Sequence, residues 1–161
     1  MTRLSRAKRI TAAYSLLDEL MASNTKPMPQ QMQTYQLTRI YESLHSLEQA
    51  PVPTLEDWRT VSDAVNMLET LIKNGQCEDA SGLLVDAITA LAQAGMRHLA
   101  GANIRLDAQG IQAVRGVVQD YATVLAALPH RAMIACHRET EKRTRGIENG
   151  SVKTHDVVVK L

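Results

Sequence analysis

The 161-residue chain contains no phenylalanine, one tryptophan and four tyrosines, so aromatic residues make up only 3 % of it. This scarcity argues against a base-stacking surface for single-stranded nucleic acid, which is usually built from aromatic side chains. The hydrophobic core must therefore come from leucine, isoleucine, valine, alanine and methionine, which suit helix-on-helix packing. Hydrophobic residues still make up 45 % of the chain, which is ordinary for a folded protein.

Cysteine is also scarce, because Cys77 and Cys136 are the only two. Two cysteines do not make a disulfide framework, and we expect both thiols to be reduced in a cytoplasmic setting. No apolar run approaches the roughly 20 residues that a membrane-spanning helix needs, and no secretory leader follows the charged start MTRLSRAKR. We therefore predict a cytoplasmic protein without a membrane segment.

Metal-type side chains gather only around His130, Cys136 and His137. Adjacent helix positions point about 100° apart, so Cys136 and His137 are poorly arranged for tetrahedral zinc. A further ligand would have to come from His98 or His155. A surface histidine beside a small buried thiol is the simpler interpretation, and we predict no metal and no cofactor.

Catalytic motifs are missing as well. Arg138 and Arg143 lie near Cys136 and favour a thiolate, but a position inside a helix and the lack of a third group argue against a nucleophile. The glycines on either side of Arg115 lack the lysine and hydroxyl residue of a phosphate-binding loop. The sequence therefore predicts no catalytic residue and no enzymatic activity.

Charge is unevenly distributed although the net charge is only +1. Residues 1–26 carry five basic and two acidic side chains, residues 130–161 carry seven and four, and residues 27–129 carry six and eleven. Basic ends around an acidic middle suit nucleic acid, an acidic partner or self-association. A solvated helix surface is the alternative interpretation.

Apolar periodicity and capping signals predict an all-α fold, a five- to six-helix bundle with a short extended C-terminal tail. The predicted helices cover residues 4–22, 29–48, a segment from the N-cap Thr54 to a stop at Asn74-Gly75, a segment from Glu78–Asp79 to about Ala94, 107–127 and 131–145. Met96–Leu106 is the longest predicted irregular connection. We expect residues 1–150 to form a single helical domain and residues 151–161 to form the tail.

Three expectations concern packing. The side chains predicted to be buried are Trp58, Leu68, Leu91, Val114, Val118, Tyr121 and Leu125. On the first helix, the residues that recur at helical spacing and are expected on its apolar side are Leu4, Ile10, Ala13, Leu16, Leu17 and Leu20. On the last helix, an acid precedes a base by four residues at Glu139–Arg143 and at Glu141–Arg145, which predicts two ion pairs.

The C-terminal part of the chain carries a resemblance. The segments that carry it are IRLD (104–107), GIQAVR (110–115), DY (120–121), LP (128–129), MI (133–134), CHR (136–138) and TE (140–141). Together they resemble uncharacterised small helical proteins encoded on bacterial prophages and integrative elements. The resemblance covers the last third to half of the chain, implies a bacterial accessory protein, and carries over no site residue.

Basic side chains cluster at both ends of the chain and could neutralise nucleic-acid phosphates. The candidate residues are Arg3, Arg6, Lys8, Arg9, Arg138, Lys142, Arg143 and Arg145. No helix-turn-helix spacing accompanies them, so any binding would be directed at the backbone and weakly specific.

The function predicted first is a non-enzymatic protein-interaction module, because this function needs no motif that the sequence lacks. Broad apolar stripes on the predicted helices can support a partner protein or a homo-oligomer, and a phage or mobile-element accessory protein fits that role. The alternative is a non-specific nucleic-acid-binding protein that uses its basic N- and C-terminal helices.

Overall fold

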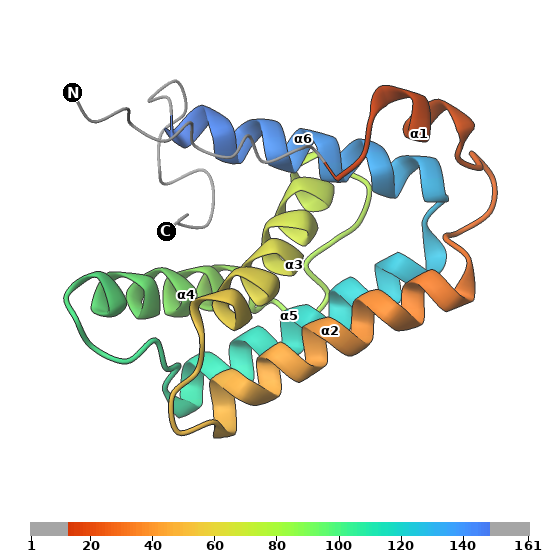
Figure 1. Ribbon diagram of the computed structural model, residues 1–161. Coiled ribbons are helices and arrows are strands. Elements are labelled where there is room, and N and C mark those ends of the chain that lie inside the picture. Colours follow the sequence, from red (N-terminus) through yellow and green to blue (C-terminus); the bar gives the residue numbers. More distant parts are fainter. Residues whose placement is uncertain (1–12, 149–161) are drawn as a thin grey trace, which may run out of the picture.

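The computed structural model describes residues 13–148. In that range the chain forms six helices and no β-strand, which confirms the predicted all-α, bundle-like fold (Figure 1). The helices are α1 (Leu16–Met21), α2 (Gln30–Gln49), α3 (Leu55–Lys73), α4 (Leu84–Leu99), α5 (Ala108–Ala127) and α6 (His130–Glu148). The expected tail, residues 151–161, lies outside the described residues. None of these six helices has the length and apolar character needed to cross a bilayer.

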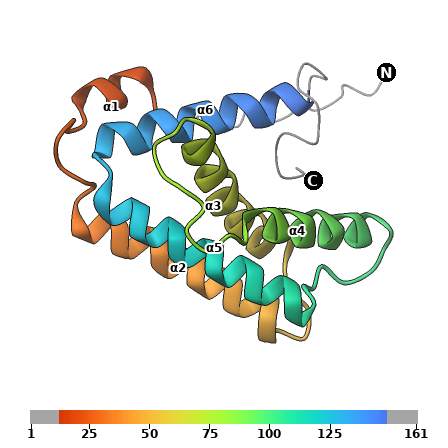
Figure 2. The ribbon, with the colours of Figure 1, turned by 180° about the vertical axis from the view of Figure 1, so that it is seen from behind.

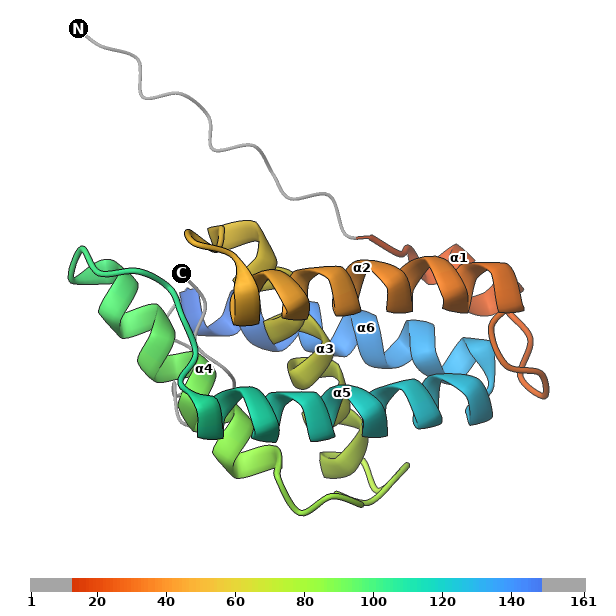
Figure 3. The same ribbon diagram turned by 90° about the horizontal axis from the view of Figure 1, so that it is seen from below.

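Helix α3 occupies the centre of the fold. It packs against α2, α4, α5 and α6, and it crosses between α6 and the neighbouring pair α2 and α5 (Figures 1 and 3). Helix α4 lies at the periphery, with one side against α5 and α3.

One hydrophobic cluster joins helices α2 to α6. Trp58 of α3 is only 1 % exposed, and its indole Nε1 donates a hydrogen bond to the Leu91 carbonyl of α4 at 3.0 Å. All seven side chains predicted to be buried are buried, which confirms that part of the sequence analysis. Burial of such large apolar side chains is the main favourable contribution to folding.

Local capping signals set several helix starts as predicted. Thr54 caps α3, because its hydroxyl accepts from the Asp57 amide at 3.1 Å while the Asp57 carboxylate accepts from the Thr54 amide. Asp107 caps α5 by accepting from the Gly110 amide at 2.6 Å. The predicted bounds of these helices, and of α2 and α6, agree with the structure to within a few residues.

The predicted bounds of α4 are wrong at both ends. The helix begins at Leu84 rather than near Glu78–Asp79, and a turn with Gly82 at a φ of 69° precedes it. Asp79 still acts as a remote cap, because its carboxylate accepts from the Leu84 amide at 3.2 Å. The helix then continues to Leu99, because Gly95 is buried in the packed face and does not end it.

The first predicted helix is also wrong where the structure tests it. Residues 4–12 lie outside the described range, and residues 13–15 are not helical. The Ser15 hydroxyl accepts from the Asp18 amide at 3.1 Å and the Asp18 carboxylate accepts from the Ser15 amide, so a capping box starts α1 at Leu16. The expected apolar side is exposed, since α1 contains no buried residue.

Polar contacts attach α1 to α6 in place of a buried apolar face. The Arg131 guanidinium donates to the Leu20 carbonyl at 2.8 Å and to the Ala22 carbonyl at 3.1 Å. The carbonyls of Ser23 and Lys26 accept hydrogen bonds from the backbone amides of Arg131 and His130 at the start of α6, at 2.9 Å and 2.8 Å. Figure 2 shows α1 lying against the N-terminal half of α6.

Candidate functional site

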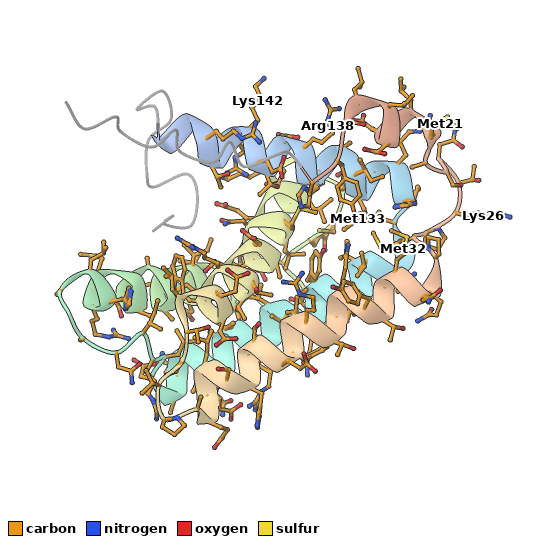
Figure 4. All side chains as sticks on the ribbon, viewed as in Figure 1. Met21, Lys26, Met32, Met133, Arg138 and Lys142 are labelled. Carbon is orange, nitrogen blue, oxygen red and sulfur yellow. The ribbon has the colours of Figure 1, made fainter. Side chains whose placement is uncertain are left out.

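The four predicted nucleic-acid-binding residues of α6 lie in different environments. Arg138 forms an ion pair with Glu19 of α1, and Arg145 lies 3.9 Å from the Glu141 carboxylate of its own helix. Lys142 is exposed and points away from the body (Figure 4). The other predicted cluster, Arg3, Arg6, Lys8 and Arg9, lies outside the described residues.

Arg143 belongs to an internal network. Its side chain is only 17 % exposed, and it donates to the Thr70 hydroxyl at 2.7 Å and to the buried Glu69 carboxylate at 3.4 Å. The predicted pairing of Arg143 with Glu139 is therefore wrong, and Glu139 accepts from the Asn74 amide at 2.7 Å instead. This network joins α3 to α6 and takes Arg143 out of any phosphate-binding surface. The second predicted pair, Glu141–Arg145, is confirmed.

Cys136 is an interior side chain of α6. It is 2 % exposed, and its thiol lies 3.4 Å from the Met67 carbonyl. Burial raises the pKa of Cys136 to about 12, with smaller effects from its neighbours. A thiol with such a pKa is almost wholly protonated at neutral pH, and only the thiolate is nucleophilic or ligates metal.

His137 lies beside Cys136 but faces a different set of neighbours. Its ring meets the Tyr14 ring edge-on with centroids 5.2 Å apart, and its Nδ1 lies 3.7 Å from the Glu141 carboxylate. Burial lowers the pKa of His137, and Glu141 opposes that shift with a smaller effect. Across residues 13–146, no three histidine, cysteine, aspartate or glutamate side chains converge as metal ligands would.

A groove of about 300 Å³ runs between α2 and α3. Arg39 and Glu56, 4.0 Å apart, are among the side chains that line it. Tyr121 and His137 line it as well, and burial raises the pKa of Tyr121, which keeps the phenol protonated. The groove is at the small end of the size range of ligand sites, and its described lining offers no activated nucleophile.

Exposed apolar side chains form two surfaces on the described part of the chain. The α1 face consists of Leu16, Leu17, Leu20 and Met21, which are 55–79 % exposed. Met21 lies on the outer side of α1, whereas Met133 points into the body (Figure 4).

The second surface, the α4 outer face, consists of Val85, Thr89, Ala92, Met96 and Leu99. Val85, Met96 and Leu99 are 72 %, 65 % and 71 % exposed. The steps of four and three residues between its members place all five on one side of the helix. The sequence contained this signal, but the incorrect helix end near Gly95 left Met96 and Leu99 outside the predicted helix.

The described residues thus offer a small open groove, cations that are largely paired, and two exposed apolar helix faces. Burial keeps the Cys136 thiol protonated, and no three metal-type side chains converge among these described residues. The likeness to prophage-encoded proteins remains a prediction from the sequence. No family model, curated protein or solved structure matches the chain.

Proposed function

We propose that this chain is a non-enzymatic protein-interaction module that docks through an apolar helix face. The α4 outer face carries the proposal, because Val85, Met96 and Leu99 are each at least 65 % exposed. Single exposed apolar residues are normal on a protein surface, but several apolar residues together on one side of a helix suit an interaction site, and here Val85, Met96 and Leu99 lie on one side of α4 with Thr89 and Ala92 between Val85 and Met96. Steps of four and three residues suit packing against another helix.

The packing of α4 against the rest of the fold supports the same function. Its opposite side is anchored by Leu84, Ala87 and Leu91, which are buried against the rest of the fold. A face that is already folded and fixed loses little conformational freedom on binding, so more of the contact energy appears as affinity. The α1 face offers a second apolar surface of the same kind.

We further propose that the module acts as an accessory protein of a bacterial phage or mobile element. The resemblance of its C-terminal part to such proteins supports this role. An accessory protein of this kind would act by binding a protein of the host or of the phage, or by self-assembly, without a reaction of its own.

Photo-crosslinking in the cells that make the protein tests the interaction. A photo-reactive amino acid replaces Met96 on the α4 outer face, and a matched chain carries it at Lys142, which is also exposed but lies on α6. We expect a protein adduct, with another copy or with a different protein, from position 96 and none from position 142. The absence of a protein adduct at position 96 would contradict the proposed function.

Non-specific nucleic-acid binding is the weaker proposal. Three of the four described candidate cations, Arg138, Arg143 and Arg145, already lie within 4.0 Å of a carboxylate. Each phosphate contact would have to replace such a pair, which reduces the gain from counterion release. A salt titration of duplex binding tests this proposal, and no binding at about 50 mM salt would end it.

A further inference from the structure

We propose that the α4 outer face binds the same face of a second copy of this chain, in antiparallel orientation and centred on Ala92. This inference rests on the proposed function and names the partner of that same surface. Two features carry it: the placement of apolar residues about the middle of the helix, and the placement of charges at its two ends.

The two ends of the α4 outer face lie symmetrically about Ala92. Val85 lies seven residues before Ala92, and Leu99 lies seven residues after it. A two-fold axis through Ala92 therefore places Val85 opposite Leu99 of the second copy, both of which are more than 70 % exposed. The small side chain at the axis allows the two helices to approach closely, since the distance between packed helices depends on the side chains at the contact.

The charges at the two ends select the antiparallel orientation. Asp86 lies in the first turn of α4 and Arg97 in the last. Eleven helical residues separate them, so both lie on the same flank of the apolar row, about 20° apart around the axis. An antiparallel pair places Asp86 of each copy near Arg97 of the other, whereas a parallel pair would leave these opposite charges about 16 Å apart along the helix axis.

Arg97 is available for such a pair. Its side chain is exposed, and one terminal nitrogen donates to the Arg105 carbonyl at 2.6 Å. A guanidinium carries five N–H donors, so the others can reach a carboxylate.

The size of the surface sets the strength of the dimer. Helix α4 has 16 residues and is therefore about 24 Å long. One such helix against another is smaller than a standard stable interface. We therefore expect a reversible dimer that dissociates on dilution.

Sedimentation of the full chain at increasing concentration tests the pairing. The parent chain should pass from a 17.8 kDa monomer to a dimer. Met96→Asp should weaken the dimer by about a hundredfold or more, because it places a charge in the apolar row. Asp86→Arg or Arg97→Asp alone should weaken it roughly tenfold, and the double exchange should restore it.

A matched control separates this effect from a general change in charge. Glu78→Arg makes the same charge change as Asp86→Arg at an exposed position outside α4, so the dissociation constant should not change. Circular dichroism confirms that each variant is folded. If Glu78→Arg weakens the dimer as much as Asp86→Arg, or if Met96→Asp leaves it intact, the two copies meet elsewhere and the inference is overturned.

Disulfide trapping tests the orientation. In a Cys77→Ser background, chains carrying Val85→Cys are mixed with chains carrying Leu99→Cys and then oxidised. A cross-linked dimer should form in the mixture and in neither sample alone, and cross-linking of Val85→Cys with itself would overturn the antiparallel arrangement.

The oligomeric state also separates this inference from the proposed function. If the chain is monomeric at every accessible concentration, the pairing is overturned. This holds even if a different protein, or residues 149–161 of the same chain, covers the α4 outer face. A photo-adduct between position 96 and a different protein would still support the interaction module. If no protein adduct forms at position 96, both the pairing and the proposed function are contradicted.

Discussion

Helices α1 and α3 both begin with a capping box but have very different lengths. In each, the side-chain hydroxyl of the N-cap residue accepts a hydrogen bond at 3.1 Å from the backbone amide of the residue three positions later. That residue is an aspartate, and its carboxylate accepts a hydrogen bond from the backbone amide of the N-cap residue. Helix α3 then runs for 19 residues, eleven of them buried, whereas α1 ends after six residues with none buried. A capping box therefore determines where a helix starts, and burial of its apolar side determines how far it extends.

The same leucine-to-alanine change in the two helices should give the largest difference in the free energy of unfolding. Leu68→Ala in α3 empties a fully buried site and should lower the free energy of unfolding by about 2–5 kcal/mol. Leu17→Ala in α1, at a position that is 67 % exposed, should change it by less than about 0.5 kcal/mol. Urea unfolding measures both, and equal losses would show that α1 is packed against something in solution.

The polar attachment of α1 should break without unfolding α3. Arg131→Met removes the donor to the Leu20 and Ala22 carbonyls and should weaken the docking of α1 by about 1–2 kcal/mol. Native-state hydrogen exchange should then speed up at the α1 amides and stay unchanged at those of α3. The control is Arg145→Met on the same helix, which should leave the exchange rates in α1 unchanged. Faster exchange in α3 of the Arg131→Met variant would contradict the local nature of the attachment.

The two capping boxes should differ in their effect on overall stability. Thr54→Ala should lower the free energy of unfolding by about 1 kcal/mol, because the cap belongs to a helix that unfolds only with the core. Ser15→Ala should change it by less and should affect mainly the exchange rates in α1. Similar losses in urea unfolding for both variants would show that α1 and the core unfold together.

The smallest expected effect is a loss of stability in mild acid. Burial holds the pKa of His137 below the ordinary value of about 6.5. The unfolded chain therefore binds the proton first, and stability falls as the pH drops from 6.5 through the lower folded pKa. His137→Gln should flatten the dependence of the urea midpoint on pH in that window, and an unchanged slope would assign it to other groups.

Local signals allowed most of the fold to be predicted from the sequence. Thr54 and Asp107 cap helices through bonds to residues three positions away, and such bonds can be read from neighbouring letters. The start of α4 could not be predicted in this way, because Asp79 caps Leu84 from the far side of a turn at Gly82. In α1, apolar spacing that continues through Ser15 concealed the start signal.

The candidate site was less predictable because it depends on what lies beside each side chain. Arg143 was expected on a phosphate-binding surface, yet Glu69 and Thr70 lie more than 70 residues away in the chain and hold it inside. The exposure of Met96 and Leu99 likewise depends on which side of α4 meets α5 and α3. The sequence contained the spacing of these residues but did not indicate which helix face would remain uncovered.

The bonds from Arg131 to α1 also bear on the order in which the chain folds. Arg131 follows Leu20 by 111 residues, so closing this contact fixes a very long loop and gains little until the core between them exists. During synthesis, α1 leaves the ribosome long before Arg131 is made. We expect α1 to dock last, after α2 to α5 have assembled, so that its attachment follows the formation of the core.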